Sequence, residues 1–217
     1  MATQLGIFNE CARLTGQPRL NVVNPSPSNT LARHLNSAYS GVVERCLQKT
    51  NFNFAMKRGI LTQLASEPVF GFQYYYQRPA DMIRLIQLNY SGYDFQPAPA
   101  DSYAEETTGF ATDAENVYAR WVSSDVRDTP GVWDPSFTRF VEVELALAVA
   151  PHVNTSVIEG LTKERSKVER EAIAISGTQQ SRSQRRPGRW STANQRRSRG
   201  GNYGGSSGSL NGGPEQA

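Results

Sequence analysis

WDPSFTRFVEVELALAVAPHV, residues 133–153, contains the most apolar run of the chain and predicts a helix. Asp134 followed by Pro135 is typical of a helix start, where a cap residue precedes a proline in the first turn. Pro151 is expected to end the helix, because proline has no backbone N–H and clashes with the preceding turn. The predicted apolar face consists of Phe137, Phe140, Val141, Leu145 and Ala148.

Two helices are predicted before this segment. Residues 3–15 carry apolar side chains at three- and four-residue spacing, and Gly16 is expected to end that helix. Residues 29–49 form a longer helix, for which Ser28 is the expected N-cap. The apolar face of this longer helix consists of Leu31, Leu35, Ala38, Val42 and Cys46.

One long helix is predicted after the segment. Ser156 and Glu159 have the spacing of a capping box at its start, and Gly177 is expected to end it. A near-heptad spacing gives this otherwise charged helix a narrow apolar seam along one side. The seam positions are Ile158, Leu161, Arg165, Val168, Ala172 and Ile175.

Strands are predicted between the second and third helices. Apolar residues alternate in FNFAMKRGILTQLA, residues 52–65, which favours a strand. The runs Phe70–Gln77, Met82–Leu88 and Val117–Val122 indicate further strands. Residues 91–113 are rich in Gly, Pro, Asp and Glu, and are expected to form a hairpin tip or an exposed excursion.

This order of elements predicts an α+β fold. The predicted elements come in runs, two helices, then three or four strands, then two helices, rather than in strict alternation. Residues 1–50 and 134–177 are therefore expected to form a helical bundle, with residues 51–133 inserted as an antiparallel β region. Residues 178–217 form an extended C-terminal arm, first basic and then rich in Gly and Ser.

Charge divides the chain into two parts. Residues 1–177 carry 16 Lys and Arg against 19 Asp and Glu, whereas residues 178–217 carry seven Arg and one Glu. A mildly acidic body thus bears a basic arm, and the asymmetry suggests an acidic partner for the arm. Residues 200–217 have almost no apolar side chains, so alone they are expected to be disordered.

Several features argue against secretion, membrane insertion and metal binding. Cys11 and Cys46 are not in a metal-binding spacing and are expected to be small buried hydrophobes in a reducing compartment. The start MATQLGIFNE lacks the pattern of a signal peptide. The best apolar run, VEVELALAVA, is broken by Glu142 and Glu144. The protein is expected to be soluble and made in a cytoplasm.

An enzyme is disfavoured by the sequence. His34 and His152 lie in different predicted helices, and neither has a nucleophile in a recognised context. There is no phosphate-binding GxxxxGK[ST] loop and no HExxH zinc motif. Carboxylates are plentiful, but solvated surface charge explains them. We therefore predict no catalytic residues, no cofactor and no metal.

An aromatic cluster lies in the second predicted strand. It consists of Phe70, Phe72, Tyr74, Tyr75 and Tyr76. Such residues can stack on nucleic-acid bases. The alternative is a sheet with aromatic residues on both faces, one face in a core and the other in a subunit contact. The second interpretation is favoured, because no basic residue occurs in the run until Arg78.

The arm RSQRRPGRW, residues 182–190, permits three interpretations. Arginine-rich disordered segments bind RNA or DNA through counterion release. They also bind acidic grooves of proteins, with Arg and Trp as anchors. The third interpretation is a solvated tail without a partner. Only one Arg-Gly-Gly occurs, at residues 199–201, so a protein groove suits the arm at least as well as RNA.

Four segments follow one another along the chain: FNFAMKRGIL, FGFQYYYQRPADMIRLIQL, VWDPSFTRFVEVELALAVAPHV and RSQRRPGRW. Together, and in this order, they resemble the head-to-tail adaptor family of tailed bacteriophages, also called tail tubular protein A. The motifs fall at Asn53–Arg58, Tyr74–Leu88, Trp133–Phe137 and Ser183–Trp190, and the resemblance covers roughly residues 5–190. Each motif alone is weak, and their order and spacing carry the similarity.

The resemblance implies a structural role. Members of the family form a ring, usually of twelve subunits, that binds the portal protein on one side and tail components on the other. The ring lengthens the channel for packaged double-stranded DNA at the head–tail junction of the virion. The family fold is a helical bundle with an inserted β region, and its C-terminal segment reaches into the portal. The Gly- and Ser-rich residues 200–217 extend beyond the family pattern.

These implications assign expected roles to particular residues. The anchors for the portal are Arg182, Arg185, Arg186, Arg189 and Trp190. The residues expected at subunit interfaces are Tyr74, Tyr75, Tyr76 and Arg165, the arginine being paired there because an unpaired buried charge is too costly. The acidic loop 101–115 is expected to face the tail protein. The alternative function is a nucleic-acid-binding protein with an arginine-rich disordered tail.

Overall fold

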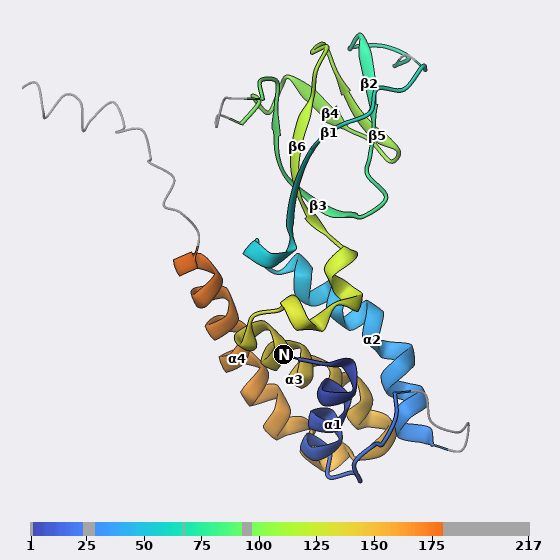
Figure 1. Cartoon of the computed structure of the whole chain (residues 1–217), viewed down its shortest axis with the longest axis vertical. Coiled ribbons are helices and arrows are strands. Elements are labelled where there is room, and N and C mark those ends of the chain that lie inside the picture. Colours follow the sequence, from blue (N-terminus) through green and yellow to red (C-terminus); the bar gives the residue numbers. More distant parts are fainter. Residues whose placement is uncertain (1, 24–28, 67, 93–96, 180–217) are drawn as a thin grey trace, which may run out of the picture. The chain divides into compact units, whose positions relative to one another are not determined.

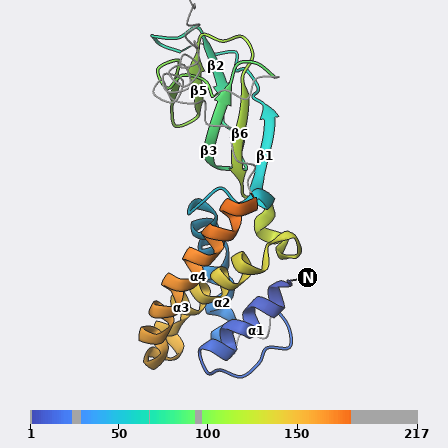
Figure 2. The same cartoon turned by 90° about the vertical axis from the view of Figure 1, so that its left-hand side faces the viewer.

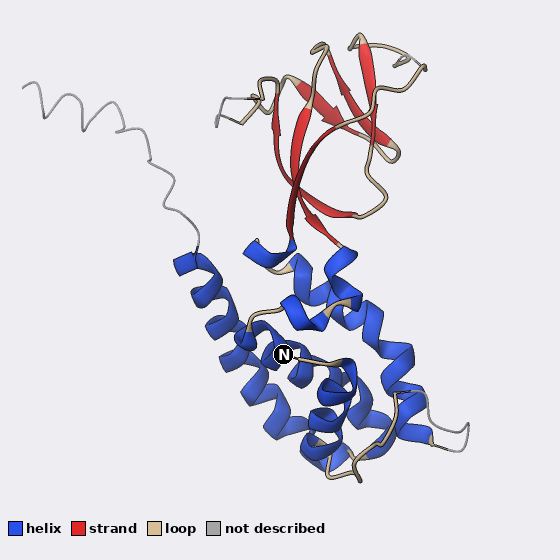
Figure 3. Cartoon of the chain, viewed as in Figure 1, coloured by secondary structure: helices blue, strands red, loops and turns tan. Residues whose placement is uncertain are grey.

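The computed structural model describes residues 2–23, 29–66, 68–92 and 97–179. These residues fall in one compact unit, Met1–Gln180. Within them the chain passes through two α-helices, six short strands and two further α-helices, with short 3-10 turns between (Figures 1 and 3). Two runs of helices on either side of a run of strands confirm the predicted α+β fold.

Helix α3 (Pro135–Val153) is the helix that the other three contact. It packs against α1 (Gln4–Leu14), α2 (Thr30–Gln48) and α4 (Ile158–Gln179), as the two views in Figures 1 and 2 show. Its buried side chains are Phe137, Phe140, Val141, Val143, Leu145, Ala146, Val149 and Ala150. This set is wider than the single predicted stripe, and a helix that is apolar on several sides must be covered on several sides.

The starts of α1 and α2 are capped by side chains. Thr3 Oγ1 accepts a hydrogen bond of 3.1 Å from the Gly6 backbone N–H. Asn29 Oδ1 accepts one of 3.1 Å from the Ala32 N–H, so Asn29 is the N-cap of α2. Ser28, the predicted cap, lies outside the described residues. Both helices otherwise agree with the predicted ranges within two residues.

The prediction that Pro151 ends α3 is wrong. The helix continues through Pro151 to Val153, and the Asn154 N–H donates to the Ala150 carbonyl at 2.9 Å. A proline in the last turn of a helix removes only the hydrogen bond that its own N–H would donate. The N–H groups of the residues after it can still bond to carbonyls of the preceding turn.

The predicted ends of α4 also need correction. Asn154, not a Ser156–Glu159 capping box, caps the turn that precedes α4, because its side chain accepts from the Ser156 N–H at 3.2 Å. At the other end, α4 runs through Gly177 to Gln179. Glycine within a helix costs only about 1 kcal/mol relative to alanine, which the neighbouring turns offset.

The helical core contains both cysteines, as predicted. Cys11 and Cys46 are each 1% exposed, and the Cys11 thiol donates to the Glu142 carbonyl oxygen at 3.3 Å. Burial raises the pKa of both thiols, with a smaller contribution from nearby glutamates. These cysteines therefore stay protonated and act as small apolar side chains.

The strands form two antiparallel sheets rather than one. Sheet A has the order β1 (Met56–Ile60), β6 (Tyr118–Ser123), β3 (Met82–Asn89). Sheet B has the order β2, β5, β4, which are Tyr74–Gln77, Gly109–Thr112 and Tyr103–Glu105. A second core between apolar side chains of these strands contains Leu61, Tyr76, Met82, Leu88, Phe110, Val117, Ala119 and Trp121.

Two predicted strands are shorter than expected. In the segment 52–65 only β1 is extended, because Phe52 and Ala55 turn into the helical core through a 3-10 turn. In the next run, Val69 and Phe70 remain 98% and 87% exposed, and the strand begins only at Tyr74. Apolar character alone therefore misplaced these strand starts.

The predicted excursion 91–113 contains two strands. All four residues of β5, Gly109–Thr112, are buried between β2 and β4. Phe110 and Thr112 favour a strand, but a run of four residues that begins with Gly109 and lies between acidic residues is too short to show a strand pattern in the sequence.

We expect Gly109→Ala to destabilise sheet B. A Cβ atom at Gly109 would lie 2.0 Å from the carbonyl oxygen of Tyr76 on β2, and a backbone atom cannot move aside without breaking the strand pair. The expected loss is about 2 kcal/mol or more in the free energy of unfolding, measured by urea denaturation.

Gly41→Ala is the matched control for this change. Gly41 is exposed within α2, and a Cβ there meets no atom within 4 Å. This variant is expected to gain about 0.5–1 kcal/mol, since alanine favours the helix. Equal stability of the Gly109→Ala variant and the wild type would contradict the close approach of β5 to β2.

Candidate functional site

Asp81 joins three segments at the end of sheet A. Its Oδ2 accepts hydrogen bonds from Trp121 Nε1 at 3.1 Å, Ser123 Oγ at 2.7 Å and Lys57 Nζ at 3.0 Å. Its carbonyl oxygen accepts from the Ser124 N–H at 2.8 Å. Burial alone would raise the pKa of Asp81, but the three side-chain donors lower it below the ordinary value of 3.8. The carboxylate thereby ties β1 and β6 to the start of β3.

The three predicted interface tyrosines differ in environment. Tyr76 is 1% exposed in the second core, and its hydroxyl donates to the Ala114 carbonyl at 2.7 Å. Residues of the same chain thus cover the Tyr76 ring. Tyr76 is therefore not available for a subunit contact, contrary to the prediction. Tyr74 and Tyr75 are half-buried, and the Tyr75 hydroxyl bonds to Thr108 at 2.6 Å.

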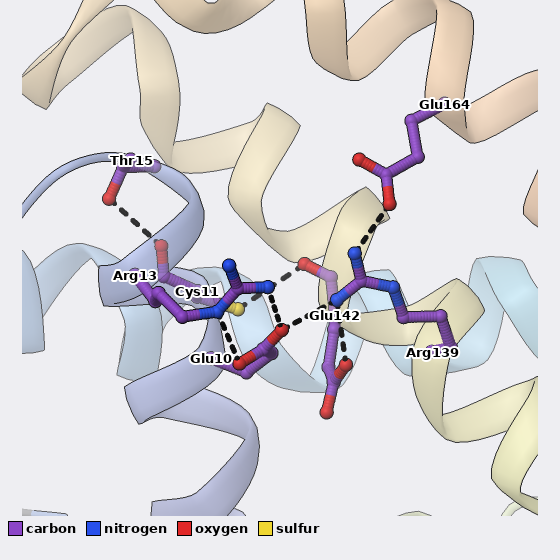
Figure 4. Close-up of polar contacts among 7 residues, drawn as sticks. All are labelled: Glu10, Cys11, Arg13, Thr15, Arg139, Glu142 and Glu164. Carbon is purple, nitrogen blue, oxygen red and sulfur yellow. Dashed lines mark hydrogen bonds and ion pairs between the residues drawn. The ribbon is translucent and has the colours of Figure 1, made fainter.

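Arg139 on α3 connects three helices (Figure 4). Its Nη1 donates to Glu10 on α1 at 2.7 Å and contacts Glu142 at 3.4 Å, while its Nη2 donates to Glu164 on α4. Arg13 also donates to Glu10, at 2.9 Å from Nε. The network binds α1 and α4 to the side of α3 through charge-assisted hydrogen bonds.

Glu142 is the carboxylate of that network whose charge is least favoured. Its side chain is 15% exposed, and burial, followed by the nearby Glu10 carboxylate, raises the pKa of Glu142 above the ordinary 4.5. For Glu10 the hydrogen bond from Arg13 is the largest influence, and its pKa is lowered. The two arginines together therefore compensate Glu10 better than Arg139 alone compensates Glu142.

Arg165 is paired within its own chain. Its Nε donates to Glu144 on α3, and the two residues line a cleft of about 380 Å³ between α2, α3 and α4. The Glu144 side chain is 15% exposed and that of Arg165 39%. The pairing expected for Arg165 is thus supplied by α3 of the same chain, while its side chain stays partly accessible.

His34 and His152 lie against one another, although the sequence placed them on separate helices. Their rings stack in parallel, 4.4 Å between centroids and 3° between planes. Nothing in the local sequence of α2 or α3 indicates this contact, because it depends on how the two helices pack.

The predicted portal anchors lie outside the described residues. They are Arg182, Arg185, Arg186, Arg189 and Trp190. Their role remains a prediction from the sequence. A second group of arginines lies on sheet A, and the sequence gives no signal for it, because the group depends on which strands pair.

Within the described ranges, no group of three or more His, Cys, Asp or Glu residues is placed to hold a metal ion. No helix in this part of the chain is long and apolar enough to cross a membrane. Comparison of the chain with protein-family models and with curated proteins found no match.

We expect Asp81→Asn to destabilise the protein by about 1–3 kcal/mol at pH 7, because three donors lose a charged acceptor. The folded pKa of Asp81 is depressed, so its contribution is present above pH 3.8 and is lost as the pH falls through the folded value. The difference from wild type, measured by urea denaturation, should therefore shrink below about pH 4.

Asp101→Asn is the control, because Asp101 is an exposed aspartate of the same β region. It is expected to change stability by less than about 0.5 kcal/mol. An equal loss in both variants would show that Asp81 has no special part in joining the strands.

We expect the stability of the Glu142→Gln variant, relative to wild type, to be higher at pH 7 than at pH 4. Because the folded pKa of Glu142 is raised, its ionisation opposes folding as the pH rises above 4.5, and glutamine removes that cost. Arg139 keeps Glu10 and Glu164 as partners. Thermal unfolding at both pH values tests this, and a larger loss at pH 7 than at pH 4 would contradict it.

Proposed function

We propose that this chain is a structural virion protein, a head-to-tail adaptor that forms a ring between the portal and the tail. The observation that carries the proposal is the order of four sequence segments that resemble the adaptor family. The described fold is compatible with it, since two pairs of helices flank a β region. The partners would be the portal protein, a tail or nozzle protein and further copies of the chain, expected to number twelve.

The residues behind the resemblance have structural roles in this chain. The Trp133 ring packs edge-on against Phe137 with centroids 5.2 Å apart, and its Nε1 donates to the Val126 carbonyl at 2.7 Å. This contact holds the start of α3, where the chain leaves the β region. Asp81, from the Pro–x–Asp part of the second motif, ties the strands together. Motifs of this kind favour a shared fold over a shared chemical reaction.

In this role the arm attaches the subunit to the portal. Arg182, Arg185, Arg186, Arg189 and Trp190 would anchor it in clefts of the portal protein, by charge and by burial of the indole ring. Each contact can be weak, because a ring presents many arms at once and avidity multiplies their effect. An arm that orders only on binding would delay assembly of the ring until a portal is present.

The body has properties that suit a ring subunit. Its 19 acidic against 16 basic residues in positions 1–177 would keep a channel wall from gripping the DNA that passes through it. The Arg165–Glu144 pair and the half-buried Tyr74 and Tyr75 would lie at subunit contacts. The acidic loop 101–115 would face the tail protein.

The second candidate is a nucleic-acid-binding protein, and the charge of the arm favours it. Seven arginines in residues 178–217 could neutralise phosphates and release counterions. Such binding would weaken steeply with salt and would be retained by the isolated arm. The adaptor proposal instead expects the arm to select the portal protein over DNA.

The deciding experiment compares the full chain with a version that ends at Gln180. This end lies at the boundary of the compact unit and keeps α4 intact. Each protein is mixed with purified portal assemblies and, separately, with duplex DNA at about 0.15 M salt, and the mixtures are sedimented. The full chain is expected to join the portal in ring stoichiometry, and the shortened chain is not.

Two variants sharpen the result. A chain that ends at Arg199 removes only the Gly- and Ser-rich extension and is expected to keep portal binding. Trp190→Ala should weaken portal binding without changing the unfolding transition of the body. If the full chain ignores the portal but binds DNA, and the shortened chain does neither, the adaptor proposal is wrong and the nucleic-acid function stands.

A further inference from the structure

Three arginines lie on one face of sheet A. Arg58 on β1 is directly opposite Arg120 on β6, and Arg84 on β3 is opposite Val122, two residues further along β6. Paired residues, and residues two apart along a strand, share a face of a sheet. The other face carries Trp121, which packs into the second core. The arginines are therefore on the face turned away from that core.

Arg58 and Arg120 line a cavity of about 330 Å³, which is at the small end of the range for ligand pockets. Gln87, Asn89 and Tyr118 add polar groups to its wall. No Asp or Glu is among the described residues that line it.

The positive charge of this face is not balanced within the described residues. None of the three arginines of sheet A forms an ion pair within the described residues. The arginines that do are Arg13, Arg78, Arg127, Arg139 and Arg165. Like charges directly opposite one another on neighbouring strands destabilise a sheet. The Arg58–Arg120 pair therefore opposes folding unless something negative lies between the two side chains.

The hydrogen bonding of these arginines points the same way. Nε of Arg120 is buried and forms no hydrogen bond within the described chain, and its Nη2 contacts only the Met56 sulfur at 2.8 Å, a weak acceptor. Nε of Arg84 is likewise buried without a bond, while its Nη2 donates to Asn51 Oδ1 at 2.6 Å. Burial and then the charge of Arg58 lower the pKa of Arg120, as expected for an uncompensated cation.

We propose that this cavity binds an oxyanion group, a carboxylate or a phosphate, carried by a small organic ligand and held between Arg58 and Arg120. Planar guanidinium groups bind both kinds of oxyanion through paired hydrogen bonds. Ile60, 67% exposed at the cavity, and the Tyr118 ring supply apolar contact for the organic body of the ligand. A concave site of this size takes one terminal group rather than the backbone of a duplex. This inference is independent of the adaptor proposal.

Calorimetric titration of the full chain tests the site. Glutarate is the carboxylate probe and glycerol 3-phosphate the phosphate probe, with the neutral glutaramide and glycerol as matched controls at constant ionic strength. At least one anion is expected to bind saturably with a Kd below about 1 mM, while the neutral compounds do not bind. The anion that binds more tightly identifies the class of ligand.

Variants locate the binding. Arg58→Gln and Arg120→Gln are each expected to weaken it at least tenfold, whereas Arg33→Gln, at an exposed position on α2, leaves it unchanged. Arg58→Gln is also expected to raise the melting temperature in ligand-free buffer, because it relieves the repulsion between the paired arginines. That readout shows that the variant is folded.

The titration is repeated in an Asp94→Asn background. Asp94 lies outside the described residues and close in sequence to the cavity residue Gly92, so this background removes a carboxylate that could compete for the arginines. Binding of neither anion in either background overturns the proposal. Equal weakening by Arg33→Gln and Arg120→Gln also overturns it, since it would show general attraction to positive charge.

Discussion

The burial of α3 on several sides is the constraint on which the helical part of the structure depends. Its eight buried side chains cannot be covered by one neighbour, and α1, α2 and α4 each take part of the surface. Each fully buried Leu, Val or Phe side chain contributes roughly 1.5–3 kcal/mol relative to exposure, so this packing outweighs the weak local features of the helix. Pro151 near its end and Gly177 in the neighbouring α4 are tolerated for that reason.

The charged residues of α3 decide how the covering helices are held. Glu142 and Glu144 lie next to the apolar surface, with side chains 15% exposed, where an unpaired carboxylate would be costly. Arg165 of α4 pairs with Glu144, while Arg139 pairs with Glu142 only at 3.4 Å and also reaches Glu10 on α1 and Glu164 on α4. These ion pairs offset part of the cost of the buried charge and connect α1 and α4 to α3.

The β region combines a well-compensated carboxylate with a group of arginines that form no ion pair with the described residues. Asp81 receives three donors and joins the strands of sheet A. On the face of the same sheet that is turned away from the second core, Arg58 and Arg120 lie opposite one another beside a cavity whose described lining contains no acidic residue. The first arrangement stabilises the fold, while the second is costly for the isolated chain and is the reason for the proposed binding of an oxyanion. Together with the basic arm, it suggests that this acidic body interacts with partners through local positive sites.

The sequence by itself determined the four helices, their approximate limits and the α+β class, because a 3.6-residue apolar pattern is a local property of each segment. It also indicated that Cys11 and Cys46 are buried and that a basic arm follows an acidic body. Only the tertiary structure decided the pairing of six strands into two sheets, the stacking of His34 on His152, the three donors of Asp81 and the arginine face of sheet A. These features depend on contacts between residues far apart in the chain, and the short strand Gly109–Thr112 acquires its burial only from the strands on either side of it.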